Sequence, residues 1–292
     1  MYGVPNYFIT QGEGMSKYNA IVVVVYNKTI AESTTINTLS NYFLKDSVLV
    51  IHNNGPKDID FGSDYERLKE KFLDVKIVND ISNSPLSILY NNFITEYSDA
   101  DKYVILDDDS TITDSFIQAL RDSDYDLELP KIVSRTDNKN YYPISAGKVV
   151  TSEGFLPTQG TFSIGSGLII SRRTVDIFDS HKITPFDESF ALYGVDVSIF
   201  RRIYKLNTQG ETFKLRTQSH LLHSLSRTEG SESAFRIKER LIDVAVSTRR
   251  YPTFRMHVHL LKKLTLTVLN RNFSGAAALV GAYFYGKHPR CR

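Results

Sequence analysis

Short apolar runs alternate with amphipathic stretches through the first third of the chain. Residues 18–26 form a continuous run rich in β-branched side chains, and residues 47–51 form a second run before a polar turn. Runs of this kind predict strands that are buried on both faces of a parallel sheet. Between them, apolar residues recur at a helical spacing over residues 29–42. The three segments together predict a βαβ unit with a right-handed crossover.

The same alternation continues to residue 106. A short charged helix is predicted over residues 65–72, a strand over 75–79, a loop passing into a helix over 83–94, and a strand over 103–106. Repeated alternation of strands and helices predicts an α/β fold whose Rossmann-like, mostly parallel central sheet is flanked by helices. Neither a Gly-x-Gly-x-x-Gly segment nor a P-loop segment follows any of these strands, which argues against NAD and P-loop chemistry.

The pattern changes in the second half of the chain. Residues 125–162 contain short β-like pieces separated by prolines, and a strand that begins with small residues follows over 161–171. Helices are predicted over 172–178 and 189–203, before a strand-like stretch that contains His220 and His223.

We expect the chain to divide into three parts. Residues 1–17 are predicted to be loosely ordered, residues 18–233 to form one α/β domain, and residues 234–292 to form a helical region. Two helices are predicted in the last part, over 234–249 and 251–269. The final stretch is rich in small and aromatic residues.

Composition and charge narrow the class of protein. A hydrophobic content of 41% and a charged content of 23% are ordinary globular values, so we expect neither disorder nor a nucleic-acid partner. The net charge of +2 hides an asymmetry, because acids nearly vanish after Asp243 while bases stay abundant. Two interpretations of this basic, aromatic segment stay open. It is either a peripheral contact with an anionic inner membrane, or a solvated face of helices that pack on the domain or on a second copy in a homodimer.

The sequence also bears on the compartment. The single cysteine, Cys291, excludes an intramolecular disulfide framework and a Cys-based zinc site, and it fits a reducing compartment. The first residues lack a signal-peptide pattern, and no apolar run approaches the roughly 20 residues of a spanning helix. We therefore expect a cytoplasmic protein that is either free or peripheral on the inner face of the plasma membrane.

Three consecutive carboxylates, Asp107, Asp108 and Asp109, follow the strand over 103–106. Open α/β sheets hold their ligands at the carboxyl ends of the strands. Three acids at such a place repel one another until a hard cation binds, and Mg²⁺ or Mn²⁺ prefers carboxylate, water and phosphate oxygens. The alternative is an acidic solvated turn in which Asp108 or Asp109 caps a helix that begins near Ile112.

Several segments, taken in order, resemble the motifs of the family 2 glycosyltransferases. The matching segments are Val24–Asn27, Val50–Gly55, Asn83–Asn91, Leu106–Asp109, Gly165–Gly167, Phe186–Glu188 and Leu192–Val197. The resemblance covers about residues 18–223. It implies the GT-A fold with a C-terminal helical extension, a nucleotide-binding half over 18–110 and an acceptor-binding half over 111–233.

The resemblance also implies a role for each matched side chain. The residues expected to bind the nucleotide sugar are Tyr26, Asn27, Asn53, Asn83, Asn91, Asp107 and Asp108. Asp109 and His223 would hold Mg²⁺ or Mn²⁺, and Asp196 would be the catalytic base. Asp187, Glu188 and Tyr193 would contact the acceptor, and the two acids are rivals of Asp196 for the role of base.

Each of these roles has a structural alternative. Asp187 and Glu188 are also suited to cap a helix near Ser189, and Asp196 to a first-turn position where the helix dipole favours an acid. His223 is equally compatible with a buried histidine that only donates and accepts hydrogen bonds. The sequence leaves these alternatives open.

The function implied by the resemblance is inverting, metal-dependent glycosyl transfer. A sugar would move from a nucleotide-diphosphate donor to a saccharide or lipid-linked saccharide acceptor, as in bacterial surface polysaccharide and O-antigen assembly by rhamnosyltransferases and related enzymes. The donor could be dTDP-rhamnose, a UDP-hexose or UDP-galactofuranose. Val195 and Ser198 replace two family acids beside Asp196, so a catalytically silent carbohydrate-binding or scaffold subunit is one alternative. A sugar nucleotidyltransferase is another, although the Gly-rich basic loop that it needs after the first strand is absent.

Overall fold

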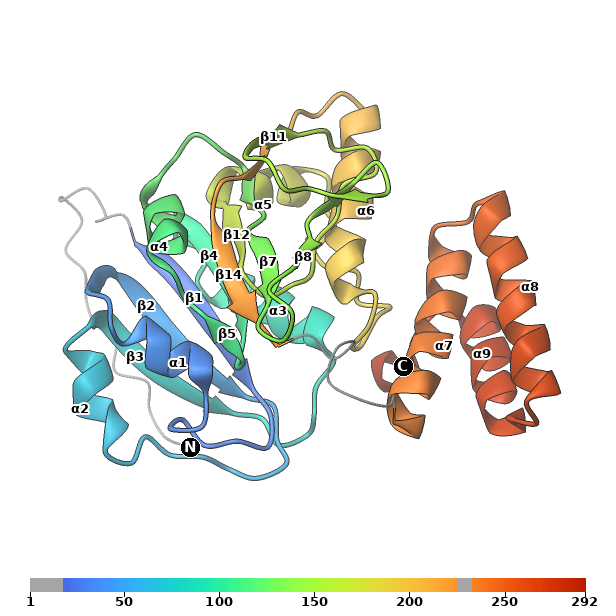
Figure 1. Cartoon of the computed structure of the whole chain (residues 1–292), viewed down its shortest axis with the longest axis horizontal. Helices are drawn as coiled ribbons and strands as arrows, with labels where there is room; N and C mark the ends of the chain where they lie inside the picture. Colours follow the sequence, from blue (N-terminus) through green and yellow to red (C-terminus); the bar gives the residue numbers. More distant parts are fainter. Residues whose placement is uncertain (1–17, 225–232) are drawn as a thin grey trace.

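The computed structural model describes residues 18–224 and 233–292 of the chain. Within these ranges an eight-stranded sheet forms the core, in the order β11-β13-β6-β12-β4-β1-β2-β3 (Figure 1). The central strand β1 (Asn19–Val25) is buried along its whole length and pairs in parallel with β2 (Leu44–Asn53) and β4 (Lys102–Asp107). β3 (Phe72–Asn79) extends the parallel part beside β2. This order is that of a Rossmann-type half, so the predicted α/β class with a mostly parallel central sheet is confirmed.

Helices cover both faces of the sheet because alternate strand residues point to opposite sides. Ile21, Val23 and Leu106 pack with the helices of one face, and Val22, Val24 and Ile105 with those of the other. The first face carries α1 (Thr34–Leu39), α2 (Asp64–Lys69) and α4 (Asp114–Arg121). The second face carries α3 (Leu86–Glu96), α5 (Arg172–Ser180) and α6 (Val195–Thr208).

The first helix is shorter than the predicted span of residues 29–42. Before it, the Glu32 carboxylate accepts hydrogen bonds from the backbone N–H and the hydroxyl of Thr29, which closes a turn. The Ser33 hydroxyl then accepts from the N–H of Ile36 and caps α1. Local side-chain hydrogen bonds of this kind compete with helix formation, and the apolar spacing alone does not reveal them.

The second half of the domain adds strands of mixed direction to the sheet. β12 (Leu168–Ser171) pairs antiparallel with β4 and with β6 (Leu127–Glu128), and β13 (Leu215–Thr217) and β11 (Gly154–Leu156) complete that edge. A four-stranded sheet stands beside it, with the order β5-β14-β7-β8. Its strands are β5 (Ser110–Thr111), β14 (His220–His223), β7 (Lys131–Ser134) and β8 (Asn140–Tyr142). A short hairpin of β9 (Ile144–Ser145) and β10 (Lys148–Val149) follows β8.

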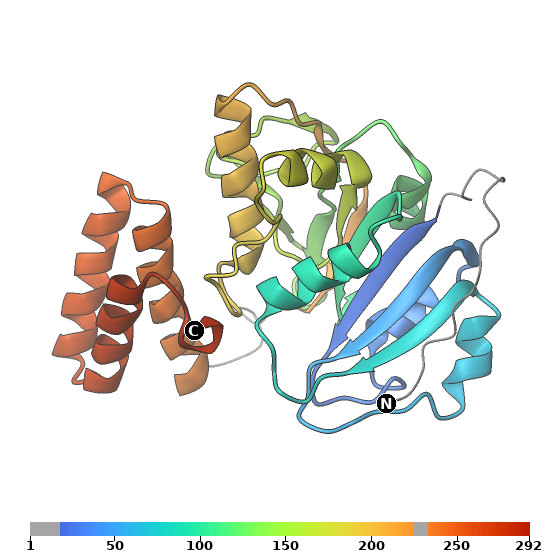
Figure 2. The same cartoon turned by 180° about the vertical axis from the view of Figure 1, so that it is seen from behind.

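Three helices form the C-terminal region, at the red end of the chain in Figures 1 and 2. They are α7 (Ala234–Arg250), α8 (Phe254–Leu269) and α9 (Phe273–Tyr285), followed by a 3₁₀ turn, η1 (Pro289–Cys291). The sequence predicted the first two, and the third occupies the small and aromatic stretch. Among the helices of the described residues, none has the length and apolar composition needed to cross a membrane. The prediction that residues 1–17 are loosely ordered concerns residues outside the described ranges.

Candidate active site

The acidic cluster lies where β4 ends, at the carboxyl edge of the parallel strands. Asp107 is the last residue of β4, and β5 begins at Ser110. The following helix, α4, is capped by Thr113, whose hydroxyl accepts from the N–H of Phe116. The alternative in which Asp108 or Asp109 caps this helix is therefore wrong. Asp108 instead forms an ion pair with Lys28, whose Nζ lies 2.6 Å from its Oδ1.

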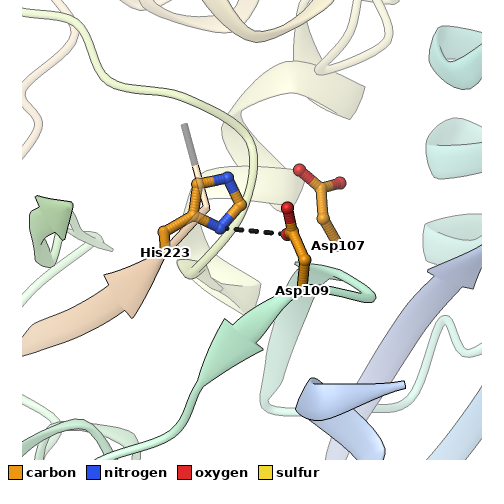
Figure 3. Close-up of side chains that lie close together, drawn as sticks. All are labelled: Asp107, Asp109 and His223. Atoms are coloured by element: carbon orange, nitrogen blue, oxygen red, sulfur yellow. Dashed lines mark ion pairs between the residues drawn. The ribbon is translucent and has the colours of Figure 1, made fainter. Parts of the chain in front are cut away.

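Two of these acids and a histidine from a distant strand form a group that could hold a metal ion. Asp107, Asp109 and His223 each offer a ligand atom, and these atoms all lie within 4.8 Å of one another (Figure 3). The Nδ1 atom of His223 lies 3.1 Å from Oδ1 of Asp109. Strand pairing explains the approach, because β14 runs antiparallel to β5 with His223 opposite Ser110.

Hydrogen bonds through two serines connect the residues of the candidate metal site. The Ser166 hydroxyl accepts from the N–H of Asp107 at 3.0 Å and lies 2.8 Å from the Ser110 hydroxyl. The Ser110 hydroxyl in turn lies 2.9 Å from Nδ1 of His223. Hydrogen bonds from β4, from the loop before β12, from β5 and from β14 thus meet at one point. Such outer contacts fix the orientation of the side chains that face a metal.

The electrostatics of the cluster fit a divalent cation. Burial raises the pKa of Asp107 well above its usual range, and the nearby carboxylates of Asp109 and Asp196 add to the increase. Burial also raises the pKa of Asp109, against the opposing effect of His223. Oδ1 of Asp109 is buried and receives no hydrogen bond from the described residues. A buried carboxylate among like charges is costly unless a cation binds it, so the donor set suits Mg²⁺ or Mn²⁺.

Asp196 stands in the first turn of α6, on another element of the same site. Gly194, with φ of 82°, lies just before the helix and turns the chain into it. The N–H of Gly165 donates a hydrogen bond to the Asp196 carboxylate. Burial raises the pKa of Asp196 to about 6, the Gly165 N–H acts in the opposite direction, and the Asp243 carboxylate adds to the increase. A carboxyl group tuned in this way is suited to proton transfer near neutral pH.

Asp243 reaches this site from α7, and nothing in the sequence motifs marked it. A β-carbon at Gly194 would lie 2.2 Å from Oδ1 of Asp243, so the absence of a side chain lets α7 approach the beginning of α6. Oδ1 of Asp243 accepts a hydrogen bond from the Ser247 hydroxyl at 3.1 Å. Burial raises the pKa of Asp243, and this hydrogen bond and the charge of Arg201 oppose the increase.

Two adjoining cavities meet at these carboxylates. One has a volume of about 730 Å³ and the other about 420 Å³. Both are lined by Asp107, Asp109, Leu192, Tyr193 and Asp196. The acidic strand end and the acid at the start of α6 therefore face the same space. That space is large enough for a nucleotide sugar on one side and an acceptor on the other.

The smaller cavity contains several of the side chains that the resemblance assigned to the nucleotide sugar. Tyr26, Asn83, Asp107 and Asp108 line it. Asn27, Asn53 and Asn91 do not line either cavity. The amide of Asn53 is turned into the protein, where it donates to the carbonyl of Lys57 and to Oδ1 of Asn79, both at 2.7 Å.

Its neighbour Asn54 lines the smaller cavity instead. Its Nδ2 donates to the carbonyl of Ser84 at 3.1 Å, while its Oδ1 is buried without a hydrogen-bond partner among the described residues. The polar end of β2 thus reaches the cavity one residue later than the sequence comparison placed it. Two adjacent asparagines in the sequence gave no means of choosing between them.

Arg290 also lines the smaller cavity and was not identified from the sequence. It comes from η1 and donates to Oδ1 of Asn83 at 3.1 Å and to Oε2 of Glu239 at 3.4 Å. Its Nε atom is buried without a partner among the described residues. Within the described part of the chain it is the only Lys or Arg that lines this cavity.

Asp187 and Glu188, predicted to contact the acceptor, line neither cavity. Asp187 is buried, and its carboxylate accepts hydrogen bonds from the Tyr251 hydroxyl at 2.8 Å and from Nε of Arg250 at 3.3 Å. Burial would raise the pKa of Asp187, but Arg202, the Tyr251 hydroxyl and neighbouring donors hold it below its usual range. This acid therefore joins the loop before α6 to the end of α7.

Glu188 also makes a structural contact within the protein. Oε1 of Glu188 accepts from Nδ2 of Asn91 at 3.0 Å, and the same amide donates to the carbonyl of Phe186 at 2.9 Å. No helix begins near Ser189, so neither acid caps one. Of the three residues assigned to the acceptor, Tyr193 is the one that lines the cavities.

Comparison with known proteins supports the fold. No protein-family model matches the sequence, and no curated protein matches it in sequence. Among solved structures, TarS of S. aureus residues 1–349 matches with a TM-score of 0.51 and 14% identity, over 93% of each chain. GalNAc-T7 in complex with UDP, GalNAc and Mn²⁺ matches with a TM-score of 0.52 and 13% identity, over 80% of this chain.

The present chain corresponds to only part of the longer neighbours. It spans 43% of the length of a second TarS structure, at a TM-score of 0.50, and 48% of the GalNAc-T7 chain. These neighbours are glycosyltransferases of the GT-A fold. The mostly parallel central sheet flanked by helices matches theirs in overall arrangement, and the chain has the GT-A fold.

Proposed function

We propose that the protein is an inverting, metal-dependent glycosyltransferase that moves a sugar from a nucleotide-diphosphate donor to a saccharide acceptor. One observation carries the proposal. Asp196, whose pKa is raised to about 6, and the Asp107, Asp109 and His223 group line one continuous space at the junction of two cavities. A base and a cation-binding cluster on either side of a reacting sugar are what this transfer needs.

The smaller cavity is the proposed donor site. Tyr26, Asn54 and Asn83 give it an aromatic ring and amide groups suited to a base and a ribose, and Asn54 Oδ1 has no hydrogen-bond partner among the described residues. Arg290 brings a positive charge to the same wall, where a diphosphate would accept charge-assisted hydrogen bonds. GalNAc-T7 was solved with UDP, GalNAc and Mn²⁺, so a UDP-linked sugar with Mn²⁺ is the first donor to test.

The larger cavity is the proposed acceptor site. Aromatic side chains line one part of it, among them Tyr141, Tyr142 and Phe162, and sugars commonly stack on such rings. Arg236 of α7 and Lys263 of α8 line another part. The resemblance to enzymes of bacterial polysaccharide assembly supports a saccharide acceptor, free or lipid-linked, and the basic wall suits one that carries phosphate.

The chain's own residues would act as follows. Asp196, in its ionised form, accepts the proton of an acceptor hydroxyl as that oxygen forms a bond to the anomeric carbon. The bond from this carbon to the diphosphate oxygen breaks on the opposite face, so the configuration inverts and the electron pair leaves with the nucleotide. The N–H of Gly165 holds the Asp196 carboxylate in place throughout. Asp107, Asp109 and His223 would hold the metal, which when bound screens the charge of the diphosphate leaving group.

The decisive experiment compares donor turnover in wild type and in Asp196→Asn. We expect release of nucleotide diphosphate from at least one donor among UDP, dTDP and GDP sugars, dependent on Mn²⁺ or Mg²⁺ and abolished by chelation. The variant should bind the nucleotide in a thermal-shift assay yet lose activity by about 10²–10⁴-fold, which is the usual effect of removing a general base.

Two results would contradict the proposal. Turnover that persists at the wild-type rate in Asp196→Asn would remove this residue as the base. Absence of turnover with every donor, together with saccharide binding, would favour the silent carbohydrate-binding subunit. Formation of a sugar nucleotide from sugar phosphate and a nucleoside triphosphate would instead identify a nucleotidyltransferase.

A further inference from the structure

The C-terminal helices expose an unusual amount of apolar surface. More than half of the large apolar side chains that the described residues expose lie between residues 254 and 285. Of the sixteen residues of α8, only Leu260 and Thr267 are buried. α7, by contrast, buries seven residues against its neighbours. α8 is thus an apolar helix that finds little cover within the described part of the chain.

Most of the exposed apolar residues of α8 lie along one side of the helix, and Leu266 is the exception. Phe254, Val258, Leu261 and Leu269 are exposed, by 85% for Phe254 and 71% for Leu269. Their spacing of four, three and eight residues places them on one side of the helix. The buried Leu260 lies on the other side, toward the bundle. The helix therefore presents an apolar surface on both sides, and only one of them is covered.

α9 repeats this arrangement. Phe273, Val280 and Phe284 are exposed and recur at intervals of seven and four residues, with Ala277 between them. The buried positions of this helix, Leu279 among them, face α7. Figures 1 and 2 show α8 and α9 side by side at the end of the molecule farthest from β3. The hairpin of residues 254–285 thus carries two outward apolar stripes.

The charge around these stripes has a single sign. After Asp243 the chain contains no Asp or Glu, but it contains nine Lys and Arg. Arg255 and Lys262 are exposed one row away from the stripe of α8, and Arg271 is exposed in the turn between the helices. An apolar face bordered only by bases is the pattern of a helix that lies in the headgroup region of an anionic membrane.

A second copy of the chain would also cover an apolar face, but the charge argues against it. A twofold contact through the hairpin would bring the same bases against themselves without an acid to pair them. Anionic lipid headgroups supply the missing negative charge. We propose that the α8–α9 hairpin docks on the surface of an anionic phospholipid bilayer, with Phe254, Leu261 and Phe284 inserted and the bases at headgroup level.

The hairpin is also part of the proposed acceptor cavity. His259 and Lys263 of α8 line the larger cavity, while Leu261 and Lys262 of the same helix are exposed. One helix therefore has one side on the cavity and another on the proposed membrane surface. Docking would bring the mouth of the cavity to the height of a lipid-carried acceptor, a consequence that rests on the proposed function. The docking itself does not depend on catalysis.

The test measures binding of the full chain to vesicles, without donor or acceptor. We expect cosedimentation with vesicles of phosphatidylcholine mixed with phosphatidylglycerol, little with phosphatidylcholine alone, and release at high salt. Lys262→Gln combined with Arg271→Gln should weaken binding to the anionic vesicles by about 25-fold, at about fivefold for each base. Leu261→Gln and Phe284→Gln should each weaken it by about tenfold.

Matched substitutions outside the α8–α9 hairpin are the controls. Lys57→Gln combined with Lys69→Gln removes two exposed bases, and Leu73→Gln and Phe155→Gln remove exposed apolar side chains. These should leave vesicle binding unchanged. The proposal is overturned if wild type ignores anionic vesicles, or if hairpin and control variants bind alike. It is also overturned if the chain is a dimer that Leu261→Gln dissociates. Donor hydrolysis in the absence of lipid tests the proposed function separately.

Discussion

The Asp196 carboxylate occupies the space that a side chain at Gly165 would need. A β-carbon at Gly165 would lie 2.6 Å from Oδ1 and 3.2 Å from Cγ of Asp196, well inside contact distance. The N–H of Gly165 also donates to this carboxylate. The loop before β12 and the start of α6 are therefore in close contact where Gly165 meets Asp196. The position of the proposed base depends on the absence of a side chain on the facing loop.

Gly165→Ala should displace Asp196 and slow the reaction without removing any functional group. A shift of about 1 Å in a catalytic group costs on the order of 10²-fold in rate, so we expect kcat to fall by about that factor. Asp196 also lines the smaller cavity, but the residues proposed to bind the nucleotide, Tyr26, Asn54 and Arg290, lie elsewhere on its wall, so nucleotide affinity should change much less than kcat. Steady-state kinetics and nucleotide titration separate the two effects.

Gly281→Ala is the matched control for this substitution. Gly281 lies within α9, and a β-carbon there would meet no atom within 4 Å. Its activity should equal that of wild type, and its stability should rise slightly because alanine favours the helix. Equal activity of Gly165→Ala and Gly281→Ala would show that the fit between Gly165 and Asp196 has no catalytic importance.

The raised pKa of Asp196 predicts an acid limb in the pH dependence of kcat. The group acts as a base only when it is ionised, and burial raises its pKa to about 6. Activity should therefore be full above this value and fall about tenfold for each pH unit below it. Rates measured between pH 5 and 8 at saturating donor and metal check the midpoint. A limb centred near the ordinary Asp value would mean that the proton acceptor is another group.

Metal binding should depend on Asp109 more than on its neighbour Asp108. Both acids carry the same charge, but only Asp109 belongs to the group with Asp107 and His223, whereas Asp108 is paired with Lys28. Mn²⁺ at a hundred times its Kd should stabilise wild type by about 2.7 kcal/mol. Asp109→Asn should lose most of this gain, and Asp108→Asn should keep it.

The same pair of variants tests the repulsion within the cluster. Without metal, Asp109→Asn should be more stable than wild type, because it removes one of the buried like charges that raise the pKa of Asp107. Thermal unfolding with chelator and with Mn²⁺ gives both quantities. An equal Mn²⁺ shift in Asp109→Asn and wild type would place the metal elsewhere.

Arg290 should contribute to donor affinity. It is the single Lys or Arg on the wall of the smaller cavity in the described part of the chain, and its buried Nε lacks a partner there. A hydrogen bond to a charged group contributes about 1.5–3 kcal/mol, so Arg290→Ala should weaken UDP binding by at least about tenfold. Calorimetric titration with UDP and Mn²⁺ measures the effect.

Arg292→Ala is the control, because its guanidinium lies over the ring of Tyr285 and outside both cavities. Its UDP affinity should match wild type. Thermal unfolding of Arg290→Ala is needed beside the titration, because Arg290 also pairs with Glu239. Unchanged affinity in a folded Arg290→Ala would exclude contact with the diphosphate.

The site residues that could be predicted from the sequence are those whose position is set by a local pattern within one strand or one helix. The strand leading to Asp107 and the helix beginning after Gly194 each carry a local pattern, and short-range rules are enough to place an acid at their ends. Asn54 was missed because alternation along a strand cannot tell which of two adjacent asparagines faces a cavity once the strand has ended. Asp243 and Arg290 were missed for a different reason. They reach the site through packing of the C-terminal helices, and no spacing in the sequence encodes that contact.

The role of Asp187 illustrates the same limit. Its sequence position beside an aromatic loop suits an acceptor contact, but in the fold two arginines, one from α6 and one from α7, lie against its carboxylate. Nη2 of Arg202 lies 3.4 Å and Nε of Arg250 3.3 Å from its carboxylate oxygens. The acid is therefore a structural tie between the domain and α7, which leads to a prediction about stability.

Asp187→Asn should destabilise the fold in a pH-dependent way. Removing one partner of a buried charge cluster costs about 3–5 kcal/mol, so we expect a loss of about 3 kcal/mol in the free energy of unfolding at pH 7. The pKa of Asp187 is lower in the folded chain than its ordinary value, mainly because Arg202 and the Tyr251 hydroxyl outweigh burial. Its contribution is therefore complete above the unfolded pKa of about 3.9 and disappears as the pH falls through the lower, folded value.

Urea unfolding of wild type and Asp187→Asn at several pH values measures this difference. The gap between the two should be largest near pH 7 and should narrow below about pH 4. Asp179→Asn is a suitable control, because Asp179 is exposed at the end of α5 and should stay within about 0.5 kcal/mol of wild type at every pH. A gap for Asp187→Asn that is independent of pH would mean that the carboxylate contributes through its shape and not through its charge.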